Sequence, residues 1–164
     1  MSTDPGLAKA INNLELVDIY MVNSESTTMN NCGSTFFEDD LENAKMLFKH
    51  FISNVSSFET STEIEDSKFL RVQIQLGIRW QTLEEPNVET GEGIEAMIEA
   101  EFAAEYKLLD KDLDDDSLTL FANKNVSYHV WPYWREFVAS QVTRMNLPKT
   151  TLPMRQRSQL LPAD

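Results

Sequence analysis

The clearest hydrophobic pattern in this chain is a strict alternation over residues 70–80. Polar residues or glycine separate its apolar members, which are Leu70, Val72, Ile74, Leu76, Ile78 and Trp80. A period of two places successive side chains on opposite faces of a strand. The alternation therefore predicts a β-strand with one buried face.

A second alternation, over residues 94–108, contains two conflicting signals. Its alanine and glutamate content favours a helix by intrinsic propensity. Its apolar positions, however, recur with a period of two, and they are Ile94, Ala96, Ile98, Ala100, Phe102, Ala104, Tyr106 and Leu108. A helix would spread these positions around its whole circumference, whereas a strand places them on one face. We predict a long strand, joined to the first by a long hairpin loop because Pro86, Asn87 and glycines lie between them.

The remaining segments have weaker patterns. Residues 14–22 carry apolar side chains at both parities, which predicts a strand covered on each side. Residues 23–34 are rich in Ser, Thr and Asn and predict a loop. Residues 38–52 fit either a short amphipathic helix or an ordered crossover, and residues 58–65 predict a further strand followed by a tight turn over 65–68.

One major helix is predicted near the C-terminal end. Pro132 fits the first turn of a helix, where its missing N–H costs nothing, and Pro148 is expected to end the helix. Apolar residues recur between them at helical spacing, namely Trp134, Val138, Val142 and Met145. Several strands followed by a helix predict an α+β fold with a four-stranded antiparallel sheet and a long helix packed on it.

Length and charge limit the possible classes of protein. The 164 residues indicate a single domain over residues 13–153, with a loose lead-in over 1–12 and a short tail over 154–164. The net charge is −13, with −17 on the first 116 residues and +4 on the remainder. Nucleic acid is an improbable partner for such a chain, because binding phosphate requires a basic surface.

The single cysteine, Cys32, and the absence of a charged-then-apolar signal segment predict a cytoplasmic protein. No apolar run approaches the roughly 20 residues that a membrane-spanning helix requires. We therefore expect no membrane insertion.

Metal and cofactor sites find little support. The acidic run over residues 112–116 resembles the start of a calcium loop, but Ser117 and Asn123 stand where that loop needs Gly and Glu. A solvated acidic turn is the preferred interpretation. Zinc needs several Cys or His ligands, and the chain has one Cys and two His. We predict neither a metal nor a cofactor.

Catalysis finds no more support. Cys32, His50 and His129 have no sequence context that brings a nucleophile, a base and a carboxylate together. His129 is expected to have a packing or capping role at the entrance of the helix. The chain is therefore not expected to be an enzyme.

The supply of flexible and aromatic apolar residues is unusual, with 9 Phe and 7 Met. Trp131, Tyr133 and Trp134 crowd one helical turn, so they cannot all face one core. Ordinary core packing plus an oligomer interface explains this excess as well as an exposed groove for segments of other chains does. The candidate groove residues are Phe36, Phe37, Phe48, Phe51 and Ile52.

Short motifs in four separated places resemble the SecB family of bacterial protein-export chaperones. Ile19 and Tyr20 match an Ile–Tyr pair in the family's first strand, and residues 70–72 match a Leu–Arg–Val strand. The most specific match is in the helix and the loop after it, at Pro132, Tyr133, Arg135, Glu136, Val142, Arg144, Pro148, Leu152 and Pro153.

This resemblance implies an ATP-independent chaperone that holds unfolded preproteins and forms a homotetramer, a dimer of dimers. Its helix would make the subunit contacts, through Trp131, Trp134, Val138, Val142 and Met145. Met97 and Glu99 match positions that dock the export motor SecA. Asn23 and Thr27 replace two acidic positions that the family uses for the same docking, which weakens the expectation of SecA as a partner.

Other functions remain open from the sequence. The tail over 154–164 is too short for the second helix that lines the client groove in the family. A chaperone dedicated to one client, such as an antitoxin, is one alternative. A small α+β ligand-binding domain or enzyme with an apolar pocket under the helix is another.

Overall fold

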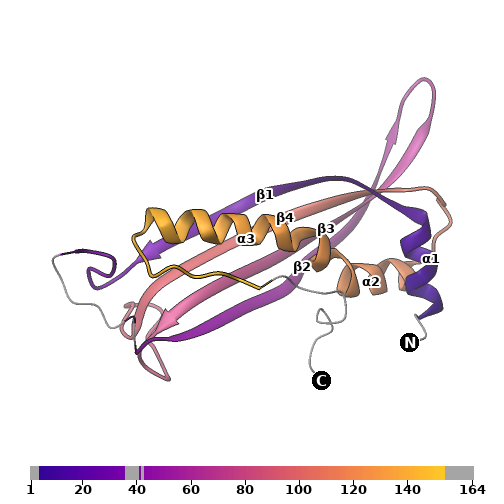
Figure 1. Cartoon of the computed structure of the whole chain (residues 1–164). Coiled ribbons are helices and arrows are strands. Elements are labelled where there is room, and N and C mark those ends of the chain that lie inside the picture. Colours follow the sequence, from indigo (N-terminus) through magenta and orange to yellow (C-terminus); the bar gives the residue numbers. More distant parts are fainter. Residues whose placement is uncertain (1–3, 36–40, 42, 154–164) are drawn as a thin grey trace.

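The computed structural model describes residues 4–35, 41 and 43–153. In this part of the chain, four antiparallel strands form one sheet in the order β1-β4-β3-β2, with a long helix after them (Figure 1). The elements are α1 (Pro5–Asn13), β1 (Leu14–Thr28), β2 (Lys45–Ser61), β3 (Asp66–Gln81), β4 (Ile94–Leu108), α2 (Asp115–Lys124) and α3 (Val126–Arg144). The predicted α+β fold is confirmed.

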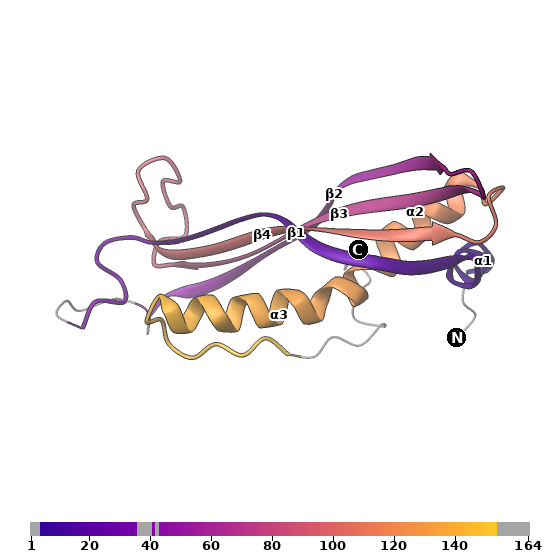
Figure 2. The same cartoon turned by 90° about the horizontal axis from the view of Figure 1, so that it is seen from above.

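The two central strands, β3 and β4, are the two alternating segments of the sequence. Their apolar positions lie opposite one another, with Ile74 facing Phe102 and Ile78 facing Ile98. All four side chains are buried. We call the face that carries them the helix-side face, because α3 lies along it (Figure 2), and the opposite face the open face. The alternation therefore predicted both the strands and their buried face correctly.

The edge strand β1 differs from its prediction. It is longer, because residues 23–28, predicted as a loop, continue to pair with β4. It is not covered on both sides, since Ile19 is its only buried residue. Register shifts between Leu16 and Asp18 and between Met21 and Asn23 interrupt the alternation. Bulges of this kind are common at sheet edges.

The other edge strand, β2, was predicted wrongly. Residues 45–52 form neither a helix nor a crossover but the first half of a strand of 17 residues paired with β3 along its length. Pairing with a distant strand has overridden the local helical spacing. The turn after β2 lies at Thr62–Glu65, earlier than predicted, and is closed by the Thr62 N–H donating to the Glu65 carbonyl (3.0 Å).

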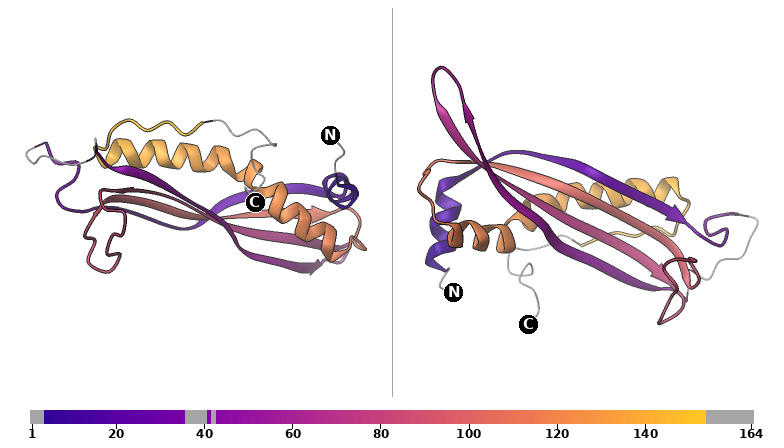
Figure 3. Two further views of the ribbon diagram at one scale, coloured as in Figure 1. Left: turned by 90° about the horizontal axis from the view of Figure 1, so that it is seen from below. Right: turned by 180° about the vertical axis from the view of Figure 1, so that it is seen from behind.

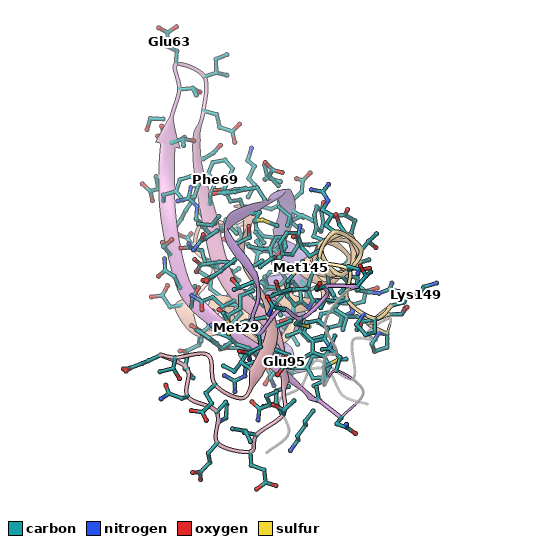
Figure 4. All side chains as sticks on the ribbon, turned by 90° about the vertical axis from the view of Figure 1, so that its left-hand side faces the viewer. Met29, Glu63, Phe69, Glu95, Met145 and Lys149 are labelled. Atoms are coloured by element: carbon teal, nitrogen blue, oxygen red, sulfur yellow. The ribbon has the colours of Figure 1, made fainter. Side chains whose placement is uncertain are left out.

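The β2–β3 hairpin extends beyond the other strands as a projecting arm (Figure 3). Glu63 lies at its tip and Phe69 near its base (Figure 4). The rings of Phe58 and Phe69 stack at 5.3 Å where the arm leaves the sheet. A two-stranded ribbon alone is only marginally stable in water, so this stacking supports the arm at its base, where Phe69 is the residue of β3 nearest the tip that pairs with β4.

The lead-in is a helix rather than a loose segment. The Asp4 side chain caps α1 by accepting from the N–H groups of Gly6 and Leu7, and Pro5 occupies the first turn. Leu7 and Ala10 are buried, so α1 belongs to the folded body. The tail over 154–164 lies outside the described residues.

The acidic run begins a helix that the sequence did not reveal. Asp114 is the N-cap of α2 and accepts from the backbone N–H of Ser117 at 2.8 Å. This bond, followed by the Lys9 ammonium at 3.0 Å, lowers the pKa of Asp114 below its ordinary value. Asp115 and Asp116 then favour the first turn through the helix dipole. The solvated turn is thus a capping device.

The long helix α3 begins at Val126, six residues before the predicted start. Pro132 therefore lies inside it and cannot donate to the carbonyl of Tyr128 one turn earlier. The helix ends at Arg144, and Asn146 follows with a left-handed φ of 54°. The predicted core-facing stripe is confirmed, but the helix start was wrong because Pro132 was assigned to the first turn.

After α3 the chain turns back along the helix as an extended segment (Figure 2). We call residues 147–153 the strap. Leu147 and Leu152 are buried, while Pro148, Lys149, Thr151 and Pro153 are exposed. Lys149 points away from the body of the protein (Figure 4).

Candidate functional site

The helix-side face is only partly covered by α3, which packs on the central strands β4 and β3. Beside the helix, on the β1 side, lies a cleft of about 290 Å³. We call it the β1 cleft, and it is lined by Leu16, Ile19, Tyr128, His129, Trp131, Pro132, Tyr133 and Arg135. Leu16 is 43% exposed and Tyr133 48%, so large apolar surface is open to solvent here.

On the other side of α3, edge strand β2 carries a row of uncovered apolar side chains. Phe48 lies opposite Ile78, Ile52 opposite Ile74, and Val55 opposite Val72. Opposed residues share a face, so this row belongs to the helix-side face. Phe48 is 59% exposed, Val55 is exposed and Ile52 half-buried. We call these three residues the β2 flank.

The predicted groove residues are therefore only partly brought together. Phe48 and Ile52 lie on the β2 flank. Phe51 lies opposite Gln75 on the open face, with the Lys49 ammonium 5.5 Å from its ring centre. Phe36 and Phe37 lie outside the described residues.

The predicted oligomer contacts face inward. Trp134, Val138 and Val142 are at most 3% exposed and Trp131 is 5% exposed, because they pack on the sheet of their own chain. Met145, at the end of the stripe, is half-buried. The four buried side chains have almost no surface left for a second copy, so their assignment to a subunit contact is corrected. Exposed positions such as Tyr128 and Tyr133 lie elsewhere on α3.

The two histidines lie in separate places, His129 within α3 and His50 on β2. The buried Tyr106 hydroxyl lies 2.9 Å from Nδ1 of His129, in the wall of the β1 cleft. Burial raises the pKa of Tyr106 above its ordinary value, so its hydroxyl stays protonated. Nε2 of His50 lies 2.5 Å from the Ser127 hydroxyl on the β2 side. The packing role predicted for His129 fits its position in the structure.

Two side chains of α3 hold the strap. Trp131 Nε1 donates to the carbonyl of Pro153 and Arg135 Nε to the carbonyl of Leu152, each at 2.8 Å. Arg135 and Leu152 also line a cleft of about 320 Å³ between α3 and the strap. Arg135 thus stands between this cleft and the β1 cleft.

The open face is polar and internally bonded. The Tyr20 hydroxyl and Arg71 Nε both donate to Oε1 of Glu105, at 2.9 and 2.7 Å. The hydrogen bond to Glu105 raises the pKa of Tyr20 above its ordinary value. Arg71 also lies over the ring of Phe58 at 5.0 Å. A chain of contacts therefore crosses all four strands.

The positions matched to SecA docking lie on this open face. The Glu99 carboxylate pairs with the Lys49 ammonium at 3.3 Å, across Gly77. A Cβ at Gly77 would stand 3.1 Å from the Lys49 Cβ and 3.3 Å from the Glu99 Cγ, so glycine leaves room for this pair. Met97 is half-buried beside it, opposite Thr27 of β1. Asn23 faces Glu101 in the same register.

Residues 4–35, 41 and 43–153 hold neither a cluster of metal ligands nor a helix suited to cross a membrane. No cluster of three or more His, Cys, Asp or Glu side chains there could hold a metal ion. None of the helices in that region has the length and apolar character needed to cross a membrane.

Sequence reasoning missed the β1 cleft and the strap. The cleft joins two edge residues of β1 to a helix more than a hundred positions later, and no local pattern carries that juxtaposition. A signal did exist for β1, because consecutive apolar residues suit an exposed edge as well as a strand buried on both faces. The only sequence signal of the strap was a leucine followed by a proline at two places, Leu147–Pro148 and Leu152–Pro153.

Comparison with known proteins identifies the fold. The structure resembles the SecB-like chaperone Rv1957 of Mycobacterium tuberculosis, solved in complex with a ChAD peptide from the antitoxin HigA1 (Rv1956). The TM-score is 0.64 at 17% identity, covering 93% of this chain and 98% of that one. A protein of unknown function from Streptococcus agalactiae matches with a TM-score of 0.37 and 6% identity, covering 85% of this chain and 96% of that one. This likeness is too weak to indicate a shared fold.

No family model matches the sequence, and no curated protein matches it either. The chain therefore has a divergent SecB-like fold, recognisable in its structure and in the short motifs of its helix, loop and strands.

Proposed function

We propose that this protein is an ATP-independent chaperone that holds non-native polypeptides on the helix-side face of its sheet. The observation that carries this proposal is the exposed apolar surface on both sides of α3, the β1 cleft and the β2 flank. Exposed contiguous apolar surface in a folded protein commonly marks a site for a partner. The proposal requires no cofactor and no catalytic step.

Physical chemistry supports extended, non-native chains as the ligand. Each apolar side chain of a client that leaves water contributes about 25 cal/mol per Å². Phe48 on the flank and Tyr133 in the cleft offer such contacts without a deep pocket that would select one shape. β2 is also an edge strand, so its outer backbone groups can bond to an added extended chain.

Two versions of this function differ in the range of clients, which is either many preproteins or a single protein. General export of preproteins requires a way to hand clients to a motor such as SecA, and Met97 and Glu99 are the residues proposed for that contact. Glu99 already pairs with Lys49, and Asn23 and Thr27 carry no charge, which disfavours this route. A chaperone dedicated to one client is the second candidate, favoured because the similar Rv1957 was solved with an antitoxin peptide.

A homo-oligomer is the proposed assembly, with β1 as the contact in place of the buried stripe of α3. Leu16, Val17, Tyr20, Met21 and Val22 are exposed along this edge. β1 pairs only with β4 among the described strands, which leaves its other edge open to a second copy. Sedimentation at micromolar concentration should show a dimer or larger species, and a monomer at all concentrations would contradict this part of the proposal. A cytoplasmic location remains a prediction from the sequence.

Light scattering of an aggregating unfolded enzyme tests the chaperone function. The purified protein at stoichiometric amounts should suppress the scattering without ATP. Equal amounts of an inert acidic protein serve as the control for crowding and charge. Undiminished aggregation would remove the proposed function, and suppression limited to one natural client would select the dedicated chaperone.

A further inference from the structure

The strap is itself an extended polypeptide bound to the surface of α3. Leu147 and Leu152 are its buried anchors, at 7% and 5% exposed. Within the described part of the chain, its backbone bonds to other backbone only at its start, where the N–H of Leu147 donates to the carbonyl of Val142 at 3.0 Å. Its far end is held by side chains, so it is attached by few contacts.

The two donors at that end bond to the backbone of the strap. Trp131 and Arg135 each bond a main-chain carbonyl at 2.8 Å, and carbonyls are common to every polypeptide. The carbonyl that Trp131 bonds belongs to Pro153, a residue without a backbone N–H. The hydrogen bonds at this end of the strap therefore depend on its backbone and not on its side chains.

The same two side chains also belong to the proposed client surface. Trp131 and Arg135 line the β1 cleft, and Arg135 lines the cleft beside the strap as well. An extended chain in the β1 cleft would lie next to the donors that the strap occupies. The strap and a client therefore compete for contacts within one small region of α3.

We propose that Trp131 and Arg135 form a carbonyl-binding subsite for extended polypeptide, and that a bound client takes this subsite over from the strap. The inference rests on the proposed function and adds to it the residues that bind the client backbone. In the free protein the strap keeps the subsite filled and covers the apolar surface under Leu152. Client affinity is then reduced by the fraction of molecules in which the strap is in place.

Methyl NMR of the full chain tests the takeover. The probe is pancreatic trypsin inhibitor, reduced and carboxamidomethylated so that it stays unfolded. Leu152 is 5% exposed in the free protein, and with saturating probe its methyl signals should move toward those of a leucine in an unfolded chain. The methyl signals of Ile78 in β3, which is also buried, serve as the internal control and should not move toward unfolded values. Leu152 signals that keep their positions would overturn the inference.

A matched pair of truncations gives an independent test. Leu152→Ala removes the strap's anchor, whereas Leu118→Ala removes an equally buried leucine from α2. Because a weaker competitor raises the competent fraction, Leu152→Ala should tighten probe binding, measured by anisotropy, by about threefold or more. Leu118→Ala should not tighten it. Unchanged or weaker binding by Leu152→Ala would overturn the inference.

The outcomes separate the two proposals. Binding of the probe with an undisturbed strap would overturn the takeover and leave the chaperone function standing. Failure of the wild-type protein both to bind the probe and to suppress aggregation would overturn the proposed function, and the inference with it.

Discussion

The two faces of the sheet are built from opposite chemistry. On the helix-side face, apolar side chains exceed what α3 can cover, and the excess lies at the edges in the β1 cleft and the β2 flank. On the open face, carboxylates such as Glu105 and Glu99 are bonded to partners on neighbouring strands. The open face pairs its charged groups and exposes Phe51 beside the Lys49 ammonium, whereas the helix-side face leaves apolar surface that nothing in the described chain covers.

This difference has a consequence for function. Arg71 and Glu105 satisfy each other on the open face, so a partner there would have to break existing contacts. Phe48 on the helix-side face is 59% exposed, so a partner there buries surface that is already in contact with water. This difference supports the proposal that non-native chains bind to the helix-side face, and substitutions chosen in pairs can test it.

The largest effect is expected on the free energy of unfolding, from a substitution between α3 and the sheet. Trp134 is 1% exposed between α3 and the sheet, and Trp134→Ala should lower the free energy of unfolding by about 3–5 kcal/mol. Tyr133→Ala, one residue away and exposed, is the control and should cost far less. Denaturant titration measures both. Equal losses for the two variants would show that α3 does not pack as described.

The second largest effect, on suppression of aggregation, distinguishes the two faces of the sheet with two substitutions in one strand. Phe48 and Phe51 both belong to β2, but Phe48 lies on the helix-side face and Phe51 on the open face. Phe48→Asp should reduce suppression of aggregation severalfold, because it places a charge in the proposed contact. Phe51→Asp should leave most of the suppression intact. A stronger loss from Phe51→Asp would assign clients to the open face.

A smaller effect is expected at the contact between Tyr106 and His129. Tyr106→Phe removes the buried hydroxyl that lies 2.9 Å from His129 Nδ1 while keeping the ring. The loss in unfolding free energy should be about 1 kcal/mol, the usual value for one hydrogen bond. Thermal unfolding with Tyr128→Phe as the exposed control measures it. No difference between the two variants would mean that the hydroxyl contributes nothing to stability.

The smallest effect is expected on the open face. Glu105→Gln weakens the contacts of Glu105 with Arg71 and Tyr20, at a position that solvent and salt can reach. Its effect on stability should be smaller than that of Tyr106→Phe and should shrink further in high salt. Suppression of aggregation should be unchanged. A marked loss of suppression would show that the open face takes part in client binding.

The central half of the fold could be predicted from the sequence, and the edges could not. β3 and β4 have a neighbouring strand on both sides, and one face of each is buried. This burial requires apolar residues at every second position, which is the pattern that predicted both strands. β1 and β2 each have one neighbour, and their exposed apolar residues occur on both faces and across register shifts instead of keeping a period of two. Residues 38–52 therefore fitted either a short helix or a crossover, whereas pairing with β3 makes residues 45–52 part of a strand.

The candidate site was predictable only in part, for a related reason. Phe48 and Ile52 were identified from their composition, but composition does not state which face a strand residue occupies, and Phe51 proved to lie opposite. The apolar stripe of α3 correctly predicted that these side chains are buried. It did not show that the sheet of the same chain, and not a second subunit, buries them. Contacts between distant segments, such as Trp131 with Pro153, have no local signature.

Methyl NMR of the full-length protein, titrated with the unfolded trypsin inhibitor used above, tests the central claim most directly. Shifts and broadening should concentrate on Leu16, Ile52 and Val55, which are three methyl-bearing residues of the edge strands on the helix-side face. The methyl of Met97 on the open face should stay unchanged. Perturbation centred on Met97 with the three helix-side residues unaffected would contradict the account.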